Sequence, residues 1–204
     1  LNISTANHSM SFWLKTTDSG ICVVSQKAQD ELVAWIQSSK IKWAAENPFS
    51  STTNINDGKW NHVCFVADGT DSYIYINGVL DATGGSQIRS SASGSAFAMG
   101  SRPGSFPYEG LISNWALFSS ALTAGEVTTL YNNGTPETAI SFSPVSWWKF
   151  DNLTTGIQDS GSASNNGTNN GASVTDIKVS TLNGVSSGMT TANLVTSDLT
   201  RSIP

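Results

Sequence analysis

Apolar and polar residues alternate in many short segments of this chain, which is the pattern of β-strands that bury one face. Gly, Ser and Asn residues separate these segments and favour turns. Short strands without helices between them predict an all-β sandwich and not a sheet with crossover helices. The expected strands cover residues 9–14, 20–25, 32–37, 40–45, 60–67, 72–76, 97–100 and 111–118, with hairpin turns at Ser38-Ser39 and Asn77-Gly78.

One short segment, residues 123–131, has the pattern of a helix. Thr123 can act as N-cap with Glu126 three residues later, which is a capping box, and Val127, Leu130 and Tyr131 give an apolar face. The sequence Asn133-Gly134 favours the end of the helix.

The composition and the hydrophobic periodicity of the chain change after Pro136. Residues 137–145 have the character of a linker, and 146–152 form an intensely apolar strand that contains Trp147 and Trp148. Beyond it, a Ser/Thr-rich segment with weak periodicity extends to Pro204.

Charged residues are only 12% of the 204 positions, and the formal net charge is -5. Nucleic-acid binding depends on clustered Lys and Arg, and the 10 such residues here are scattered. No apolar run is long enough to cross a membrane. We therefore expect neither nucleic-acid binding nor membrane insertion. The Ser, Thr, Asn and Gly content is typical of extracellular and virion proteins.

The two cysteines, Cys22 and Cys64, lie in apolar strand-like segments outside any metal-binding or redox motif. The sequence favours two buried free thiols. A disulfide is the alternative if their strands are neighbours.

Two motifs in order, DGKWNHVCFVADGTDSYIYINGVL at 57–80 and GLISNWALFSSALTAGEVTTLY at 110–131, resemble the laminin-G-like branch of the concanavalin A-like lectin/glucanase jelly rolls. The resemblance implies an all-β, two-sheet antiparallel jelly-roll sandwich with one short helix. The fold is mostly a scaffold for surface recognition, and it does not by itself define a function.

The laminin-G-like family places an aromatic strand of the type WWxFD at its start, whereas the matching residues here are 147–151. The resemblance therefore implies that 1–136 is a sandwich lacking its opening strand, that 137–145 is a linker, and that 146–204 opens another repeat. Tandem repeats of this type are associated with marine phages and bacteria. Residues 146–151 should either fold back as a circular permutation or insert into a neighbouring copy, and the repeat interpretation favours insertion.

Glucanases of this superfamily carry paired catalytic glutamates on one strand. The glutamates here lack a carboxylate partner two or four positions away; they are Glu31, Glu46, Glu109, Glu126 and Glu137. His62 belongs to the WNHV strand motif, for which a structural role is expected. We therefore expect a protein that is not an enzyme.

A calcium site is implied by resemblance to laminin-G-like loops that supply oxygen ligands, the kind that Ca²⁺ prefers. The matching residues are Asp159 and Asn165. Asn114, on the strand 111–118, stands where the family often has an acidic residue, which weakens such a site.

A glycan site is the other expectation, because sugars stack on aromatic rings and need hydrogen-bonding partners for their hydroxyls. The candidate residues are Trp35, Trp43, Arg102, Phe106 and Tyr108. Phe106 and Tyr108 lie in a Gly/Pro-rich loop, where a core position is a weaker explanation than in a strand.

Together these features predict a non-catalytic binding or adhesion module on an extracellular or virion surface, with a glycan or surface polysaccharide as its partner. The alternative is a structural capsid-decoration or fibre subunit that assembles with other copies of itself, or with neighbouring surface proteins, by strand exchange.

Overall fold

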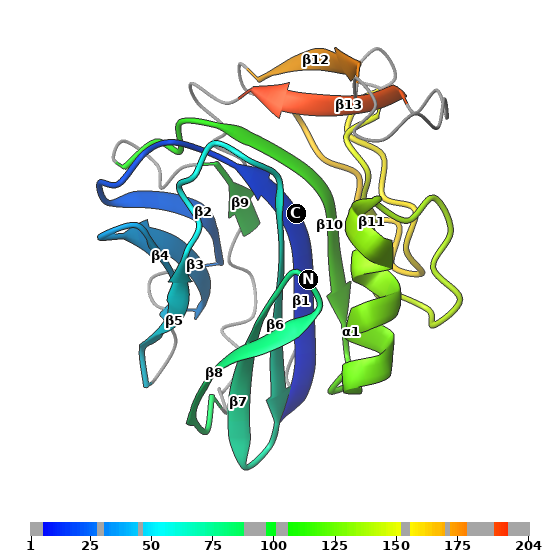
Figure 1. Ribbon diagram of the computed structural model, residues 1–204. Helices are drawn as coiled ribbons and strands as arrows, with labels where there is room; N and C mark the ends of the chain where they lie inside the picture. The colour runs from blue at the N-terminus through cyan, green and yellow to red at the C-terminus, as the bar shows by residue number, and fades with distance from the viewer. Residues whose placement is uncertain are drawn as a thin grey trace.

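Two antiparallel sheets pack face to face in the computed structural model (Figure 1). The structure describes residues 6–27, 31–44, 47–87, 97–100, 106–151, 156–169, 172–178 and 190–195. The expected all-β, two-sheet sandwich is confirmed, with one short α-helix within these ranges.

Sheet A has eight strands, seven of which follow one another in the order β12-β13-β10-β1-β6-β7-β8. The eighth, β11, pairs with β10 on the edge away from β1. The strands, in sheet order, are β12 (Ser173–Lys178), β13 (Thr190–Val195), β10 (Leu111–Phe118), β1 (Asn7–Lys15), β6 (Asn61–Asp68), β7 (Asp71–Ile76) and β8 (Val79–Gly85), with β11 at Ser146–Trp148.

Sheet B has five strands in the order β5-β4-β3-β2-β9. They are β5 (Phe49–Asn54), β4 (Lys40–Ala44), β3 (Glu31–Gln37), β2 (Cys22–Lys27) and β9 (Phe97–Met99). At one side of the sandwich β5 contacts β8, where the Asp81 carboxylate accepts hydrogen bonds from the backbone N–H groups of Thr52 and Thr53.

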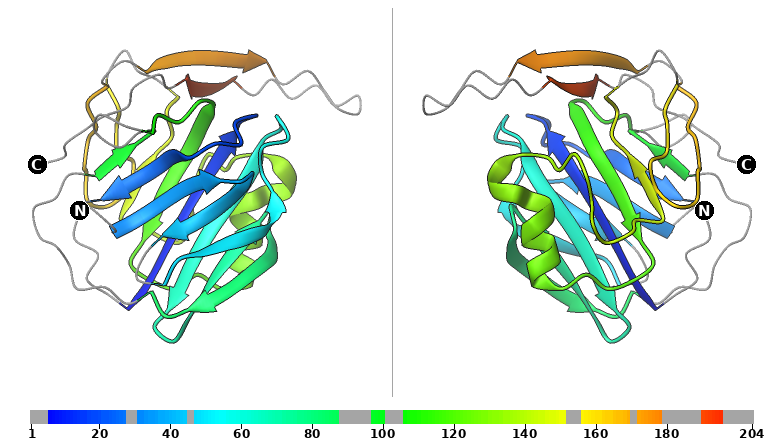
Figure 2. Two further views of the ribbon diagram at one scale, coloured as in Figure 1. Left: turned by 90° about the vertical axis from the view of Figure 1, so that its left-hand side faces the viewer. Right: turned by 90° about the vertical axis from the view of Figure 1, so that its right-hand side faces the viewer.

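The central strands of sheet A, β1, β6 and β10, are buried on both faces, and sheet B is buried on one. Met10, Phe12 and Leu14 of β1 point into the core between the sheets. Cys64 and Val66 of β6 belong to a second cluster on the outer face of sheet A. Helix α1 (Ala124–Tyr131) covers that outer face, whereas no described element covers the outer face of sheet B (Figure 2).

The capping residues of α1 follow the sequence prediction. The Thr123 hydroxyl accepts a hydrogen bond from the Glu126 N–H, and the Glu126 carboxylate accepts one from the Thr123 N–H at 2.7 Å. Val127 and Leu130 are buried against sheet A. Asn132 closes the helix in the left-handed conformation and begins a short 3-10 turn (Asn132–Gly134).

Strand β11 pairs with β10 of its own chain, which is the fold-back arrangement, and insertion into a neighbouring copy stays a prediction. Its adjacent tryptophans point to opposite faces, as alternate residues of a strand must. Trp147 packs in the cluster beneath α1, and Trp148 enters the core between the sheets. There Trp148 lies 5.6 Å from Trp115 and 5.9 Å from Phe97, measured between ring centroids. The segment therefore fills a place in the sandwich that residues 1–136 leave open.

The two cysteines are buried and free, as favoured. Cys22 lies on β2 of sheet B, and Cys64 lies on β6 of sheet A. Their strands are not neighbours, so the disulfide alternative is excluded.

We predict that Trp148→Ala lowers the free energy of unfolding by about 3–5 kcal/mol, the usual cost of removing a buried large aromatic side chain. Urea unfolding monitored by circular dichroism measures the change. Val79→Ala is the control, because Val79 is 68% exposed and its truncation should change stability by less than about 0.5 kcal/mol.

The wild-type unfolding midpoint should not depend on protein concentration, because β11 is held within one chain. A midpoint that rises with concentration would show that copies exchange this strand.

Candidate functional site

The open outer face of sheet B carries a row of partly exposed side chains centred on Trp35. Its neighbours on β3, Ala34 and Ile36, are fully buried in the core, so Trp35 and Gln37 point to the other side. Strand register places Trp35 opposite Lys42 of β4, and Lys42 opposite Ser50 of β5. One aromatic ring therefore lies among amide, ammonium and hydroxyl groups.

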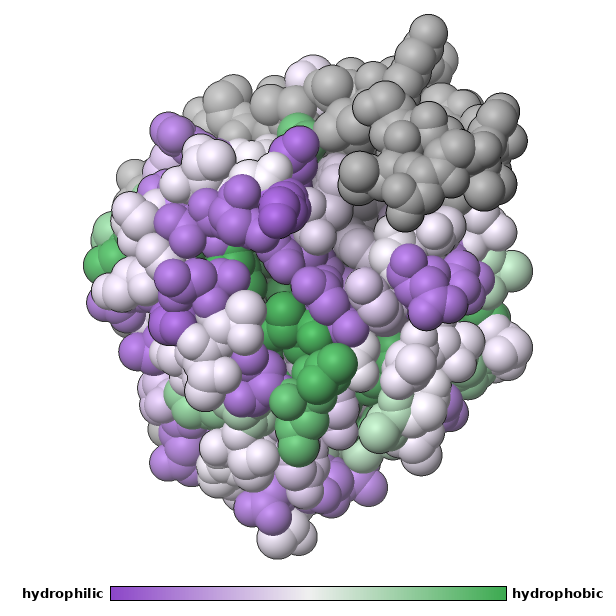
Figure 3. Space-filling model, in the orientation of Figure 1, coloured by the Kyte–Doolittle hydropathy of each residue, from purple (hydrophilic) through white to green (hydrophobic). Residues whose placement is uncertain are grey.

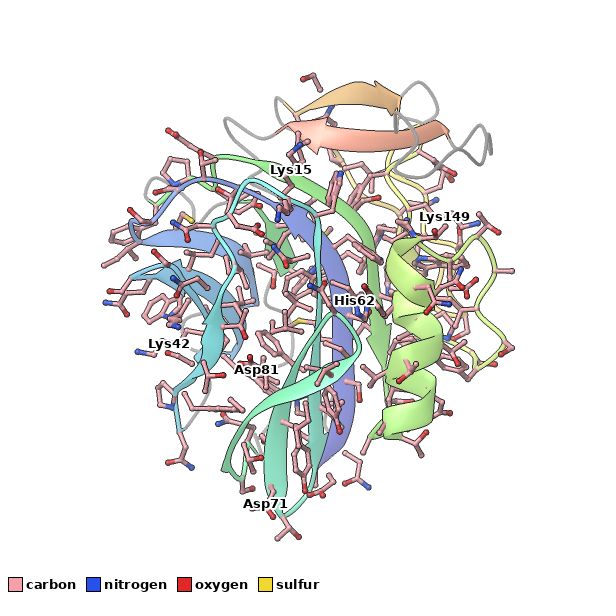
Figure 4. All side chains as sticks on the ribbon, in the orientation of Figure 1. Lys15, Lys42, His62, Asp71, Asp81 and Lys149 are labelled. Carbon is pink, nitrogen blue, oxygen red and sulfur yellow. The ribbon has the colours of Figure 1, made fainter. Side chains whose placement is uncertain are left out.

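Lys42 and Trp35 contact each other directly. The Lys42 ammonium nitrogen lies 5.5 Å from the centre of the indole ring, which is a cation–π arrangement. Figure 4 shows Lys42 pointing away from sheet A and out of the molecule. Lys40, two residues earlier on the same side of β4, donates a hydrogen bond to the Thr52 carbonyl. A flat apolar surface and two cations thus occupy one open face.

Trp43 and Tyr108 are core residues, so their prediction as ligand-binding residues is wrong. Trp43 pairs with Ala34 and is fully buried, with its ring stacked on Phe65 at 5.0 Å. Tyr108 is fully buried, and its hydroxyl donates to the backbone carbonyl of Lys15 at 3.1 Å. Burial also raises the pKa of Tyr108 well above its usual value. Replacing Tyr108 would therefore affect stability and not a ligand rim.

Phe106 remains exposed, with 43% of its side chain accessible and a positive φ of 56°. Arg102 lies outside the described residues. Trp35 lies on β3, whereas Phe106 comes from the segment between β9 and β10. It is a second, separate aromatic candidate.

A further exposed apolar patch lies on β8 (Figure 3). Val79 and Leu80, which follow the Asn77-Gly78 turn, are 68% and 50% exposed. Gly78 is required in this turn, because its φ is +80° and an added Cβ would lie 2.9 Å from the Tyr131 ring. This patch offers apolar contact alone, whereas the Trp35 row combines a ring with polar groups.

The predicted calcium ligands Asp159 and Asn165 are brought together, and the Asp159 carboxylate and the Asn165 backbone carbonyl both accept hydrogen bonds from the protein. The Asp159 carboxylate accepts hydrogen bonds from the backbone N–H groups of Trp147, Gly161 and Asn165, all within 2.8 Å. The Asn165 carbonyl accepts from the Trp148 indole at 2.8 Å. These hydrogen bonds from the loop therefore hold strand β11 in place.

Asn114 also contacts β11 and not a free site. Its side-chain oxygen accepts a hydrogen bond from the Trp147 indole at 3.1 Å. Asp159 and Asn114 thus hold β11 through their side-chain oxygens, and the calcium site stays a prediction. Within the described ranges there is also no group of three or more His, Cys, Asp or Glu side chains placed to hold a metal ion.

Ser11 and His62 form a hydrogen-bonded pair that the sequence did not indicate. The Ser11 hydroxyl lies 2.8 Å from Nε2 of His62, which is the distance expected between a nucleophile and its base. Both side chains are buried, and His62 contacts the rings of Trp13 and Tyr131. Burial lowers the pKa of His62 from its ordinary 6.5 to about 3. A substrate cannot reach this pair, which supports the structural role expected for His62.

A family model described as the concanavalin A-like lectin/glucanases superfamily matches residues 1–128. No curated protein sequence matches the chain. None of the described helices is long and apolar enough to cross a membrane.

Similar solved structures share the fold at low identity. A candidate carbohydrate-binding protein from Bacteroides ovatus is 16% identical, with a TM-score of 0.63; the match covers 99% of this chain and 56% of that protein. Domain 4 of an extracellular arabinanase from Geobacillus stearothermophilus, in complex with arabinotriose, is 23% identical over 63% of this chain and 68% of that one, with a TM-score of 0.50. The binding domain of botulinum neurotoxin serotype D is 16% identical over 65% of this chain and 38% of that domain, with a TM-score of 0.51.

We predict that Asp159→Ala lowers the free energy of unfolding by about 1–3 kcal/mol, because it leaves N–H groups of β11 and its loop without an acceptor. The loss should be equal in calcium and in the chelator EGTA. Asp68→Ala is the matched control: its carboxylate also accepts N–H groups of a turn, but there water can replace it. A wild-type melting temperature that falls in EGTA, with no such fall in Asp159→Ala, would instead establish a calcium site.

We also predict that His62 makes stability depend on pH. Its pKa is lower in the folded state, so its contribution is complete above pH 6.5 and is lost as the pH falls towards 3, at up to about 1.4 kcal/mol per pH unit. The measurement is urea unfolding across this range. His62→Gln should remove most of the dependence, and an unchanged pH profile in that variant would show that carboxyl groups cause it.

Proposed function

The chain belongs to the concanavalin A-like lectin/glucanases superfamily through residues 1–128, and on that premise we propose that it is a non-catalytic module that binds glycans on the open face of sheet B. The observation that carries the proposal is Trp35, a partly exposed aromatic ring in the middle of an uncovered sheet. Apolar sugar faces stack on such a ring, and hydroxyl groups bond to the polar side chains beside it.

The surroundings of Trp35 suit a sugar. Gln37 offers an amide that can both donate and accept, Ser50 a hydroxyl, and Lys42 an ammonium donor. The strands beneath hold these groups in fixed register, which reduces the entropy lost on binding. The arabinotriose held by the Geobacillus domain of similar fold supports the same class of ligand.

The non-catalytic part of the proposal is supported by the placement of the acid–base groups. Glu126 caps helix α1, and the Ser11–His62 pair is buried beneath that helix. Glu109 is exposed on the loop before β10, where its backbone carbonyl accepts a hydrogen bond from the Thr16 hydroxyl.

The proposed setting is an extracellular or virion surface, which the hydroxyl-rich and weakly charged composition supports. The rival role as a fibre or capsid subunit depended on strand exchange. That role is less favoured, because β11 occupies its own sheet.

Trp35→Ala should reduce glycan affinity about tenfold or more, since truncation of an aromatic hot spot costs about 2 kcal/mol. A glycan array identifies a ligand for the wild-type chain, and isothermal titration then measures its affinity for each variant. The melting temperature confirms that Trp35→Ala folds.

Phe106→Ala is the matched control, because it removes the other exposed aromatic candidate. Loss of binding in Phe106→Ala with retention in Trp35→Ala would move the site to the 106–110 loop. Absence of any bound glycan for the wild-type chain would refute the proposed function.

A further inference from the structure

The described part of the open face of sheet B, around β4, is basic on a protein that is acidic as a whole. The formal net charge is -5, yet the outward side chains of β4 include Lys40 and Lys42. The described outward side chains around them are uncharged: Trp35, Gln37, Ser50 and Asn54. The nearest described carboxylate on the adjoining strand of sheet A, Asp81, is occupied by the N–H and hydroxyl groups of Thr52 and Thr53.

The Lys42 ammonium lies over part of the ring that a sugar would need. A neutral sugar that stacks on Trp35 must displace this cation and receives no ionic contact in return. A sugar that carries an acid group can take the place of the cation–π contact and form an ion pair with Lys42 at the same time. An exposed cation–π contact is weak, and the acid group replaces it with a charge-assisted hydrogen bond to the same ammonium. The exchange therefore favours the acidic sugar.

Lys40 extends the positive charge along β4. Residues two positions apart on a strand are about 7 Å apart and point to the same side. The hydrogen bond from Lys40 to the Thr52 carbonyl holds its ammonium on this face. Two cations in a row suit a polymer that repeats its acid groups more than a single charged sugar.

We propose that the Trp35 row is a site for acidic polysaccharides, with a sugar ring on Trp35 and a carboxylate or sulfate group on Lys42. The inference rests on the proposed glycan-binding function and adds the charge of the ligand to it.

The chain contains a matched control for Lys42. Lys149 lies 4.2 Å from the centre of the Trp147 ring, so it forms the same kind of pair. Trp147 is only 5% exposed beneath Lys149, and it offers no platform for a sugar. Figure 4 shows Lys42 and Lys149 on opposite sides of the molecule. Replacing either lysine with Gln changes the net charge equally, but only one change alters the proposed site.

The test is affinity electrophoresis of the whole chain in gels that contain dextran sulfate or dextran, and polygalacturonate or its methyl ester. Each acidic polymer then has a neutral twin with the same backbone, and the two pairs separate sulfate from carboxylate recognition. Wild type should bind at least one acidic polymer about tenfold more tightly than its twin, and added NaCl should weaken this binding. Lys42→Gln should remove the preference, and Lys149→Gln should retain it.

Equal binding of a polymer and its neutral twin, with no effect of Lys42→Gln, would overturn the inference and leave the proposed function standing. Equal losses in Lys42→Gln and Lys149→Gln would show attraction by overall charge, which also overturns it. If none of the four polymers is bound, the acidic-polymer inference fails, and the glycan array decides the proposed function separately.

Discussion

The packing of Trp148 against Phe97 and Trp115 is the contact on which the rest of the structure depends. The three rings come from β11, from β9 of sheet B and from β10 of sheet A, so one cluster joins both sheets and the segment that follows the helix. Each ring brings a large apolar area into the core, and hydrophobic burial contributes about 25 cal/mol per Å². The hydrogen bonds of Asp159, Asn114 and Asn165 then fix β11 in its register beside β10.

This arrangement also determines which surface is available for recognition. Helix α1 and Trp147 cover the outer face of sheet A, and Ser11 and His62 are enclosed beneath them. Burial of both faces of β1, β6 and β10 leaves the middle of sheet A without a surface for a ligand. Sheet B, whose outer face is uncovered, is left to present Trp35 and the two lysines of β4. The position of the short helix therefore determines which sheet face is available for ligand binding.

Local signals predicted much of the fold. The capping box of Thr123 and Glu126 and the strand at 111–118 depend on neighbours in sequence, and both were found where expected. Strand β5 was not predicted, and β8 was implied only by the hairpin turn at Asn77-Gly78, because most of their described side chains are exposed and give no alternation. Strands β12 and β13 lie in a segment whose periodicity is weak. The partner of β11 could not be read from the sequence, because fold-back and insertion bury the same two tryptophans.

The sequence singled out Trp35 among the candidate residues, and the wrong prediction for Trp43 could have been avoided. In a hairpin that turns at Ser38-Ser39, Trp35 pairs with Lys42 and Trp43 pairs with Ala34, so the two tryptophans must lie on opposite faces. Tyr108 gave no such signal, because a tyrosine in a loop reaches the core only through tertiary contacts. Asp159 was predicted as a calcium ligand, and nothing in the sequence indicated that its carboxylate accepts three N–H groups of its own chain.

The position of β11 in the chain also sets the order in which the molecule can be completed. Met10, Phe97 and Trp115 emerge from the ribosome before Trp148, Phe150 and Ile157, yet all of them share one core. Until the later residues arrive, the edge of β10 has no strand beside it and the aromatic cluster has a gap. Domains generally fold as units, and an incomplete core with an unpaired edge is prone to aggregation. For this protein, the interval between synthesis of β10 and synthesis of β11 is therefore the vulnerable period of its biogenesis.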